Sequence, residues 1–150
     1  MISLDIKILR LLSSQQLLSP SIGTSQDPRR LIEKGNSSLK EGDLDLALKS
    51  YRRAARIRPS SSAERRSALV LGMMGRYMEA IGSLDRAAEM EPLDPMPWIF
   101  RGFIFWRLER WQEATSSFER AVALRPEDGY ARYCRAISAE EMNKRRRRRC

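Results

Sequence analysis

The fold is decided by residues 98–126, which read WIFRGFIFWRLERWQEATSSFERAVALRP. Small residues stand at fixed places among bulky ones in this stretch, and a proline ends it. The same columns recur along the chain at intervals of 33 or 34 residues: Pro59, Pro92 and Pro126; Ala47, Ala80 and Ala114; Ala54, Ala87 and Ala121; Gly35, Ala68, Gly102 and Ala136. Small residues and a terminating proline that repeat with this period are typical of stacked helix–turn–helix units.

Capping residues mark where the helices begin. Asp27-Pro28 places an N-cap side chain before a proline at the first helical position, where the missing N–H costs nothing. Asp94-Pro95 repeats this arrangement, and Asp128 can cap the last helix. We therefore predict three helix pairs and a final single helix, at about Pro28–Glu41 and Leu44–Arg58, Ser61–Met74 and Tyr77–Glu91, Pro95–Leu108 and Trp111–Arg125, and Gly129–Asn143.

Each first helix must stop and turn before its partner begins. Gly42 and Gly75 stand at this place in the first two units, and glycine permits the left-handed conformation that such stops favour. The third unit has Glu109 there, so we expect its turn to be built differently.

These residues resemble the tetratricopeptide repeat family. The third unit carries the family's W, G, Y, Y, A, F, A and P columns as Trp98, Gly102, Phe105, Trp111, Ala114, Phe118, Ala121 and Pro126. The first unit matches at Gly35, Gly42, Ala47, Tyr51, Ala54 and Pro59, and the second at Ala68, Gly75, Tyr77, Ala80, Leu84, Ala87 and Pro92. The resemblance implies an all-α superhelix with repeats at 28–60, 61–94 and 95–128 and a capping helix at 129–143.

The small columns have a physical role in this fold. Gly or Ala lets two helix backbones approach closely where a first helix crosses its partner. Tyr51, Leu84 and Phe118 are expected to fill the space between successive units. Glu64 departs from the pattern, because a bulky apolar residue is usual there, and it predicts a looser joint between the first and second units.

The chain has two further segments outside the repeats. Residues 1–18 are rich in Ile and Leu with a narrow polar face, and residues 19–27 form a linker that contains Pro20 and Gly23. The first segment fits a helix that packs on the repeats, and it also fits an organelle-targeting or membrane-surface helix. No run of about 18 apolar residues is present, so no membrane span is predicted. We expect a cytoplasmic protein, with targeting by residues 1–18 or nuclear import by the tail as alternatives.

Catalysis is not predicted. The chain has no histidine, which removes the commonest general base and metal ligand. Cys134 and Cys150 are the only thiols, and two cysteines without histidine make a poor zinc site. Phosphate-binding loops and nucleophile elbows are also missing. We therefore expect no enzyme activity, no metal and no cofactor.

The resemblance implies that the first helix of each unit lines a concave groove that binds extended peptides or partner helices. The polar and mixed part of this predicted groove consists of Asn36, Lys40, Arg65, Arg66, Leu69 and Met73. Its apolar part lies on the first helix of the third unit and consists of Met96, Ile99, Phe100, Phe103 and Trp106. An exposed patch of large apolar groups usually marks an interaction surface, with Phe100 and Trp106 as its anchors. Two alternatives remain open: the N-terminal or final helix covers the patch, or the patch supports self-association.

Some family members use this groove to clamp the carboxylates of chaperone tails. Asn36 stands in one of the clamp columns here, but the others hold Ile32, Arg66, Met96 and Phe100. A carboxylate would meet apolar groups where it needs charge-assisted donors. The sequence does not favour a chaperone clamp.

The basic C-terminal tail, residues 144–150, is the second candidate site. Its cations are Lys144, Arg145, Arg146, Arg147, Arg148 and Arg149, and they account for six units of a net charge of +9. Such a run is expected to be disordered or to fray, and it could contact nucleic-acid phosphates or acidic surfaces. We predict a non-catalytic adaptor or scaffold that binds another protein in its groove, with nucleic-acid or acidic-surface association through the tail as the alternative.

Overall fold

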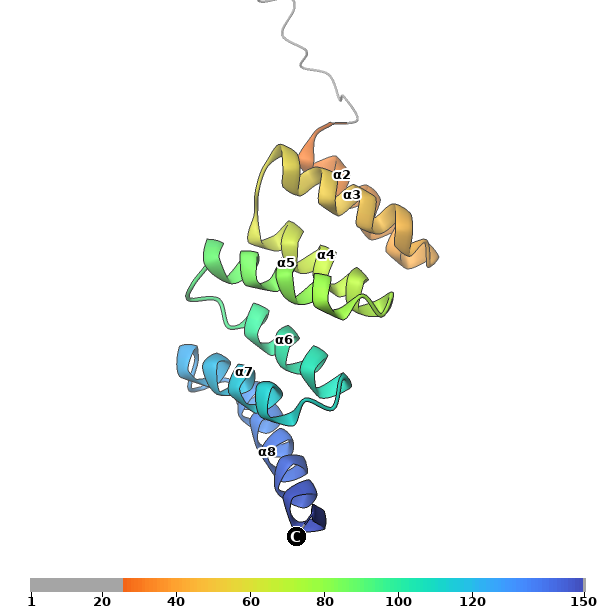
Figure 1. Ribbon diagram of the computed structural model, residues 1–150. Helices are drawn as coiled ribbons and strands as arrows, with labels where there is room; N and C mark the ends of the chain where they lie inside the picture. Colours follow the sequence, from red (N-terminus) through yellow and green to blue (C-terminus); the bar gives the residue numbers. More distant parts are fainter. Residues whose placement is uncertain (1–25, 150) are drawn as a thin grey trace, which may run out of the picture.

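The computed structural model describes residues 26–149, and this range contains seven α-helices and no β-strand. The helices are α2 (Pro28–Glu41), α3 (Leu44–Ile57), α4 (Ser61–Met73), α5 (Tyr77–Met90), α6 (Met96–Arg107), α7 (Trp111–Leu124) and α8 (Gly129–Arg149). Each helix packs on the next in sequence, and the pairs stack into one elongated array from α2 to α8 (Figure 1). The predicted helix at 1–18, most of the linker and Cys150 lie outside the described residues. The predicted all-α superhelix is confirmed.

The helix starts depend on side-chain caps. The carboxylates of Asp27 and Asp94 each accept a backbone N–H of the first turn at 3.0 Å, and Asp128 accepts two, at 3.0 and 3.1 Å. All three follow the predicted pattern. Asp43 and Ser60 cap α3 and α4 in the same way, at 2.9 and 3.2 Å, and these two were not predicted.

The three first helices end in the same geometry. Gly42, Gly75 and Glu109 all have positive φ, at 83°, 75° and 57°. In each case the next residue donates its N–H to a carbonyl five residues back, at 2.9, 2.8 and 2.9 Å. The expectation of a different turn at Glu109 was therefore wrong. The left-handed backbone costs a non-glycine residue about 1–2 kcal/mol. Two hydrogen bonds hold it at Glu109, from the Glu109 N–H to the Trp106 carbonyl and from the Arg110 N–H to the Phe105 carbonyl, each at 2.9 Å.

Small residues set the distance between paired helices. A Cβ added to Gly35 would lie 2.5 Å from the Tyr51 ring, and one added to Gly102 would lie 2.5 Å from the Phe118 ring. Tyr51, Phe118 and Leu84 are at most 1% exposed, so all three are core side chains, and the glycine contacts of Tyr51 and Phe118 lie within one unit. Their expected role between successive units stays a prediction. At both glycine crossings a large aromatic side chain packs directly on the backbone of the partner helix.

The joint between the first two units is not loose. Glu64 is only 9% exposed, and its two carboxylate oxygens accept hydrogen bonds from Arg86 at 3.1 and 2.9 Å. The helices of this joint, α3 and α4, contact each other more extensively than α5 and α6 do at the next joint. The predicted weakness was wrong because the arginine of the same unit neutralises the acid.

The final helix is longer than predicted. It continues through residues 144–149, which were expected to fray. Lys144 pairs with Glu140 and Glu141 at 2.9 and 3.0 Å. Arg145 pairs with Glu109 at 2.9 Å, and its guanidinium lies 5.0 Å from the centre of the Trp111 ring. These contacts attach the start of the basic run to the last helix pair, so the run continues the helix.

Candidate functional site

An apolar hollow of about 450 Å³ opens between α4 and α6, on the face formed by the first helices. Its lining comes from three helices and consists of Ala68, Leu69, Gly72, Met73, Tyr77, Leu84, Phe100, Phe103, Ile104 and Arg107. Leu69 and Met73 are 47% and 57% exposed, so two large apolar side chains of the lining remain open to solvent. Arg107 is the single charged residue of this lining.

The hollow exists because its two walls differ in size. The α4 wall includes Ala68 and Gly72, and a Cβ added to Gly72 would meet no atom within 4 Å. The α6 wall carries the rings of Phe100 and Phe103. Phe103 is held in place by an edge-to-face contact with Phe118, with ring centres 5.4 Å apart. The small residues Ala68 and Gly72, opposite the rings of Phe100 and Phe103, leave a space that an apolar side chain can enter.

The apolar residues of the predicted groove do not all reach this hollow. Leu69, Met73, Phe100 and Phe103 line it. Ile99 is 2% exposed and belongs to the core, so its expected groove position was wrong. Trp106 is half-buried and lies outside the lining, with its ring centre 6.1 Å from that of Trp111.

Met96 is also half-buried and outside the hollow. Conversely, Gly72, Tyr77, Ile104 and Arg107 line the hollow and were not predicted. The spacing of apolar residues along the sequence does not reveal these four, because the hollow forms where side-chain volume is missing between two helices.

The polar residues of the predicted groove are mostly engaged within the protein. The Asn36 side-chain oxygen accepts from the Tyr51 hydroxyl and from the Arg66 guanidinium, both at 2.8 Å. Arg65 pairs with Asp94 at 3.0 Å. Lys40 is exposed and takes no part in these hydrogen bonds and ion pairs. Asn36 and Arg66 therefore join the first two units, Arg65 is paired with the Asp94 cap of α6, and all three have less capacity for a ligand than expected.

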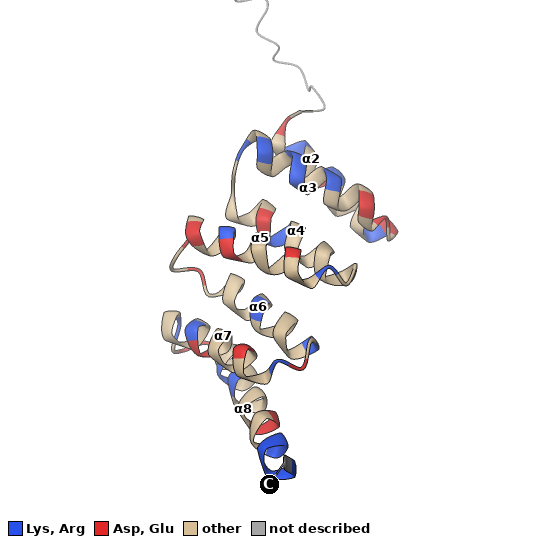
Figure 2. Ribbon diagram, in the orientation of Figure 1, with Lys and Arg blue, Asp and Glu red and all other residues tan. Residues whose placement is uncertain are grey.

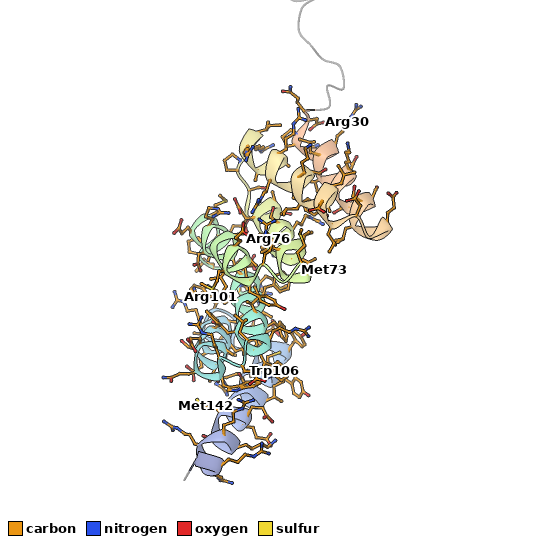
Figure 3. All side chains as sticks on the ribbon, turned by 45° about the vertical axis from the view of Figure 1, so that its right-hand side comes forward. Arg30, Met73, Arg76, Arg101, Trp106 and Met142 are labelled. Atoms are coloured by element: carbon orange, nitrogen blue, oxygen red, sulfur yellow. The ribbon has the colours of Figure 1, made fainter. Side chains whose placement is uncertain are left out.

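Part of the apolar patch is covered by the final helix. The Tyr130 ring at the start of α8 lies 6.0 Å from the Phe103 ring, centre to centre. This contact covers one edge, whereas Leu69 and Met73 stay exposed at the other. In Figure 2 the α6 ribbon is mostly uncharged, between a cation-rich α2–α3 end and a cation-rich tip of α8. Figure 3 shows Met73 and Arg101 on opposite sides of the array.

Residues 26–149 carry neither a candidate metal site nor a candidate membrane span. This range holds no group of three or more residues that could ligate a metal, and none of its helices is long and apolar enough to cross a membrane. Cys134 is 1% exposed, and burial raises the pKa of its thiol. It belongs to α8 and lies on the side of that helix that packs into the core.

Comparison with known proteins agrees with this architecture. Family models described as tetratricopeptide repeat match residues 28–61, 65–129 and 101–144. The chain belongs to the tetratricopeptide repeat family. It is 31% identical over 105 residues to the tetratricopeptide repeat-containing protein trd-1 of Caenorhabditis elegans, a match that covers 66% of this chain. The chain spans only 14% of the length of that relative.

Solved structures of low sequence identity share the fold. The first tetratricopeptide repeat domain of Spaghetti (RPAP3), bound to the HSP90 peptide SRMEEVD, superimposes with a TM-score of 0.71 at 21% identity, covering 80% of this chain and 96% of that one. The Sgt2 domain from Aspergillus fumigatus gives a TM-score of 0.74 at 14% identity, covering 85% and 88%. At these identities the comparison establishes the arrangement of helices and leaves the ligand open.

Proposed function

We propose that this tetratricopeptide repeat array is a non-catalytic protein-interaction module that binds a peptide or a partner helix on its first-helix face. The hollow between α4 and α6 is its main contact. The observation that carries this proposal is the exposure of Leu69 and Met73 beside a cavity of about 450 Å³. Concave apolar surface with exposed anchors usually marks a binding site.

The hollow suits a ligand with apolar side chains. One or two such side chains can occupy the space between Ala68 and Gly72 of α4 and the rings of Phe100 and Phe103 of α6. Arg107 at the same hollow can bind a carboxylate of the ligand, because it forms no ion pair with another residue of 26–149. The ligand is therefore an apolar segment with an acidic neighbour.

A chaperone-tail clamp of the kind described above is not favoured. Asn36, the one residue in a clamp column, has its side-chain oxygen bonded to Tyr51 and Arg66. The peptide SRMEEVD is bound by the Spaghetti domain, and this supports peptide binding by the fold without transferring that peptide here.

The test is affinity capture of partners by the full chain and by two double variants. Leu69→Gln with Met73→Gln removes the exposed wall of the hollow. Met78→Gln with Leu93→Gln is the matched control, because these residues are 66% and 82% exposed and lie outside the hollow. We expect the control to keep its partners and the hollow variant to bind them at least about tenfold more weakly. Equal retention by the two variants would contradict the proposal.

Two further measurements separate the alternatives. Phe100→Ala and Trp106→Ala, compared singly, distinguish the hollow from the neighbouring Trp106–Trp111 contact. Loss of binding on Arg146→Gln, Arg147→Gln and Arg148→Gln, together with steep weakening by salt, would assign association to the basic tail instead. Light scattering of the purified chain would reveal self-association through the same face.

A further inference from the structure

We propose that the N-terminal end of the array binds an acidic amphipathic helix of another protein, seated as the second helix of a preceding unit would be. The site, called here the end face, is a hollow of about 250 Å³ between α2 and α3. Its lining consists of Arg30, Leu31, Lys34, Leu46, Lys49, Ser50 and Arg53. It shares no residue with the hollow between α4 and α6.

The end face concentrates positive charge that the described part of the chain does not neutralise. Arg30 and Lys34 lie one helical turn apart on α2, and Lys49 and Arg53 lie one turn apart on α3. All four are exposed, and none pairs with an acid within residues 26–149. Like charges at this spacing repel each other. Figure 2 shows the cations gathered on α2 and α3, and Figure 3 shows Arg30 at this end of the array.

The repeat explains what kind of surface this is. Counting 33 residues forward from Leu31, Lys34 and Arg53 leads to the corresponding positions of the second unit, which are Glu64, Ser67 and Arg86. Those three residues line a hollow whose other wall is the preceding helix α3. The end face is therefore the same joint without a preceding helix among the described residues, and its shape fits a helix.

Arg30, which precedes Leu31, also has a counterpart in the second unit. Arg30 corresponds to Ala63 of α4, which is fully buried. A small buried residue in the second unit is thus replaced by an exposed cation at the end face. The helix that docks there must bring negative charge where α3 brings packing.

The joint between units two and three already contains a carboxylate in the corresponding place. Asp85 of α5 accepts a hydrogen bond from Arg101 of α6 at 2.7 Å. Arg101 stands two repeats after Lys34, in the same column. A carboxylate at the place of Asp85 on a docked helix would meet Lys34 in the same way.

A second carboxylate is needed opposite Arg53. Its counterpart Arg86 is neutralised by Glu64 of its own unit, but the first unit has Leu31 in the glutamate column. Arg53 therefore lacks the partner that its counterpart has. Leu31 and Leu46 instead provide an apolar floor between the cations, suited to an aliphatic side chain. Acidic residues flanking aliphatic ones on a helix match this arrangement.

Other occupants fit less well. The chain's own residues 1–25 contain one acid, Asp5, against Lys7 and Arg10, so they do not supply an acidic helix. No aromatic ring lines the end face, so it offers no platform on which nucleic-acid bases could stack. An acidic protein helix uses both the charges and the apolar floor.

The experiment measures binding of a fluorescent synthetic helix to the full chain by anisotropy, at about 0.15 M salt. The probe is about 16 residues long, with leucines on one face and glutamates flanking them. A peptide of identical composition with scattered leucines is the control probe. Lys34→Glu and Arg53→Glu test the end face, and Arg132→Glu is the matched control, because it reverses one exposed charge at the other end of the array.

We expect the chain and Arg132→Glu to bind the probe equally, and Lys34→Glu or Arg53→Glu to raise its Kd about tenfold each. The scattered peptide should bind about tenfold more weakly. The proposal is overturned if both peptides bind alike, if Arg132→Glu weakens binding as much, or if a thymidine oligonucleotide of equal charge binds more tightly. The Leu69→Gln, Met73→Gln variant should bind the probe normally, so this site and the hollow between α4 and α6 can fail independently.

Discussion

The helix crossing at Gly102 offers a quantitative test of how the small residues shape this array. An added Cβ would lie 2.5, 2.7 and 2.8 Å from three ring atoms of Phe118, whereas ordinary van der Waals contact begins near 3.4 Å. The ring cannot easily move, because Phe118 is fully buried and Phe103 packs against it edge to face. In Gly102→Ala, α6 and α7 must therefore separate or the ring must leave its place.

Two contributions of opposite sign determine how Gly102→Ala changes the free energy of unfolding. Overpacking of this kind costs about 1–3 kcal/mol. Replacing a helical glycine by alanine otherwise gains about 0.5–1 kcal/mol. We expect Gly102→Ala to lower the free energy of unfolding by about 0.5–2 kcal/mol. Gly82→Ala in α5 is the matched control, because its new Cβ would have only the Arg86 guanidinium near it, at 3.8 Å, and it should gain the propensity term alone.

Urea denaturation followed by circular dichroism at 222 nm gives both free energies of unfolding by linear extrapolation. The gap between the two alanine variants should be about 1–3 kcal/mol, since the propensity term cancels. In a Phe118→Leu background the cost of Gly102→Ala should shrink by at least about 0.5 kcal/mol, because the smaller side chain relieves the contact. Equal stability of Gly102→Ala and Gly82→Ala would refute the reasoning, since it would mean that the crossing tolerates a methyl group.

Three other predictions concern single side chains. Glu109→Gly should be more stable than Glu109→Ala by about 1 kcal/mol in the same urea assay, because both lose the carboxylate and only alanine keeps a Cβ at positive φ. In a Cys150→Ser chain, Cys134 should react with a disulfide reagent only after denaturation, because burial covers it and raises the pKa of its thiol. The Glu79 carboxyl should titrate by NMR below the ordinary glutamate pKa, because hydrogen bonds from Arg76 and then Arg52 favour its charged form. Its contribution to stability is then present above that ordinary pKa and is lost as pH falls through the lowered value; an Arg76→Gln variant should raise the pKa.

The sequence predicts the helices of this protein and their pairing well, because both depend on packing constraints that recur in every repeat. Gly35 and Gly102 must be small at the crossings, and the predicted caps Asp27, Asp94 and Asp128 satisfy N–H groups that any helix start leaves free. Such requirements act within one or two helices, so a repeated column reveals them.

The site is less predictable because it depends on relations between units. Ile99 and Phe100 are neighbours with similar apolar character, yet only a three-dimensional arrangement shows that one is core and the other lines the hollow. Glu109 was misjudged because the turn geometry is enforced by backbone hydrogen bonds that do not require glycine. The extended α8 depends on Arg145 meeting Trp111 and Glu109 across the last turn, a contact that charge counting misses.

The two ends of the array differ in a way that links stability to binding. In a stacked repeat, stability is approximately a sum of the intrinsic terms of the units and the terms of the joints between them. The α6–α7 pair has neighbours on both sides, since α5 packs on α6 and α8 packs on α7. Among the described residues the α2–α3 pair contacts only the second unit, by packing on α4 and through the Arg52–Glu79 ion pair with α5, and its other side carries the unpaired cations around Lys34 and Arg53. The hollow therefore lies between two units that each contact further helices on their other side, whereas a helix bound at the end face would add a joint to the first unit and stabilise it. Hydrogen exchange in α2 and α3 should slow when the acidic helix binds, while a ligand in the hollow should act mainly on α4 and α6.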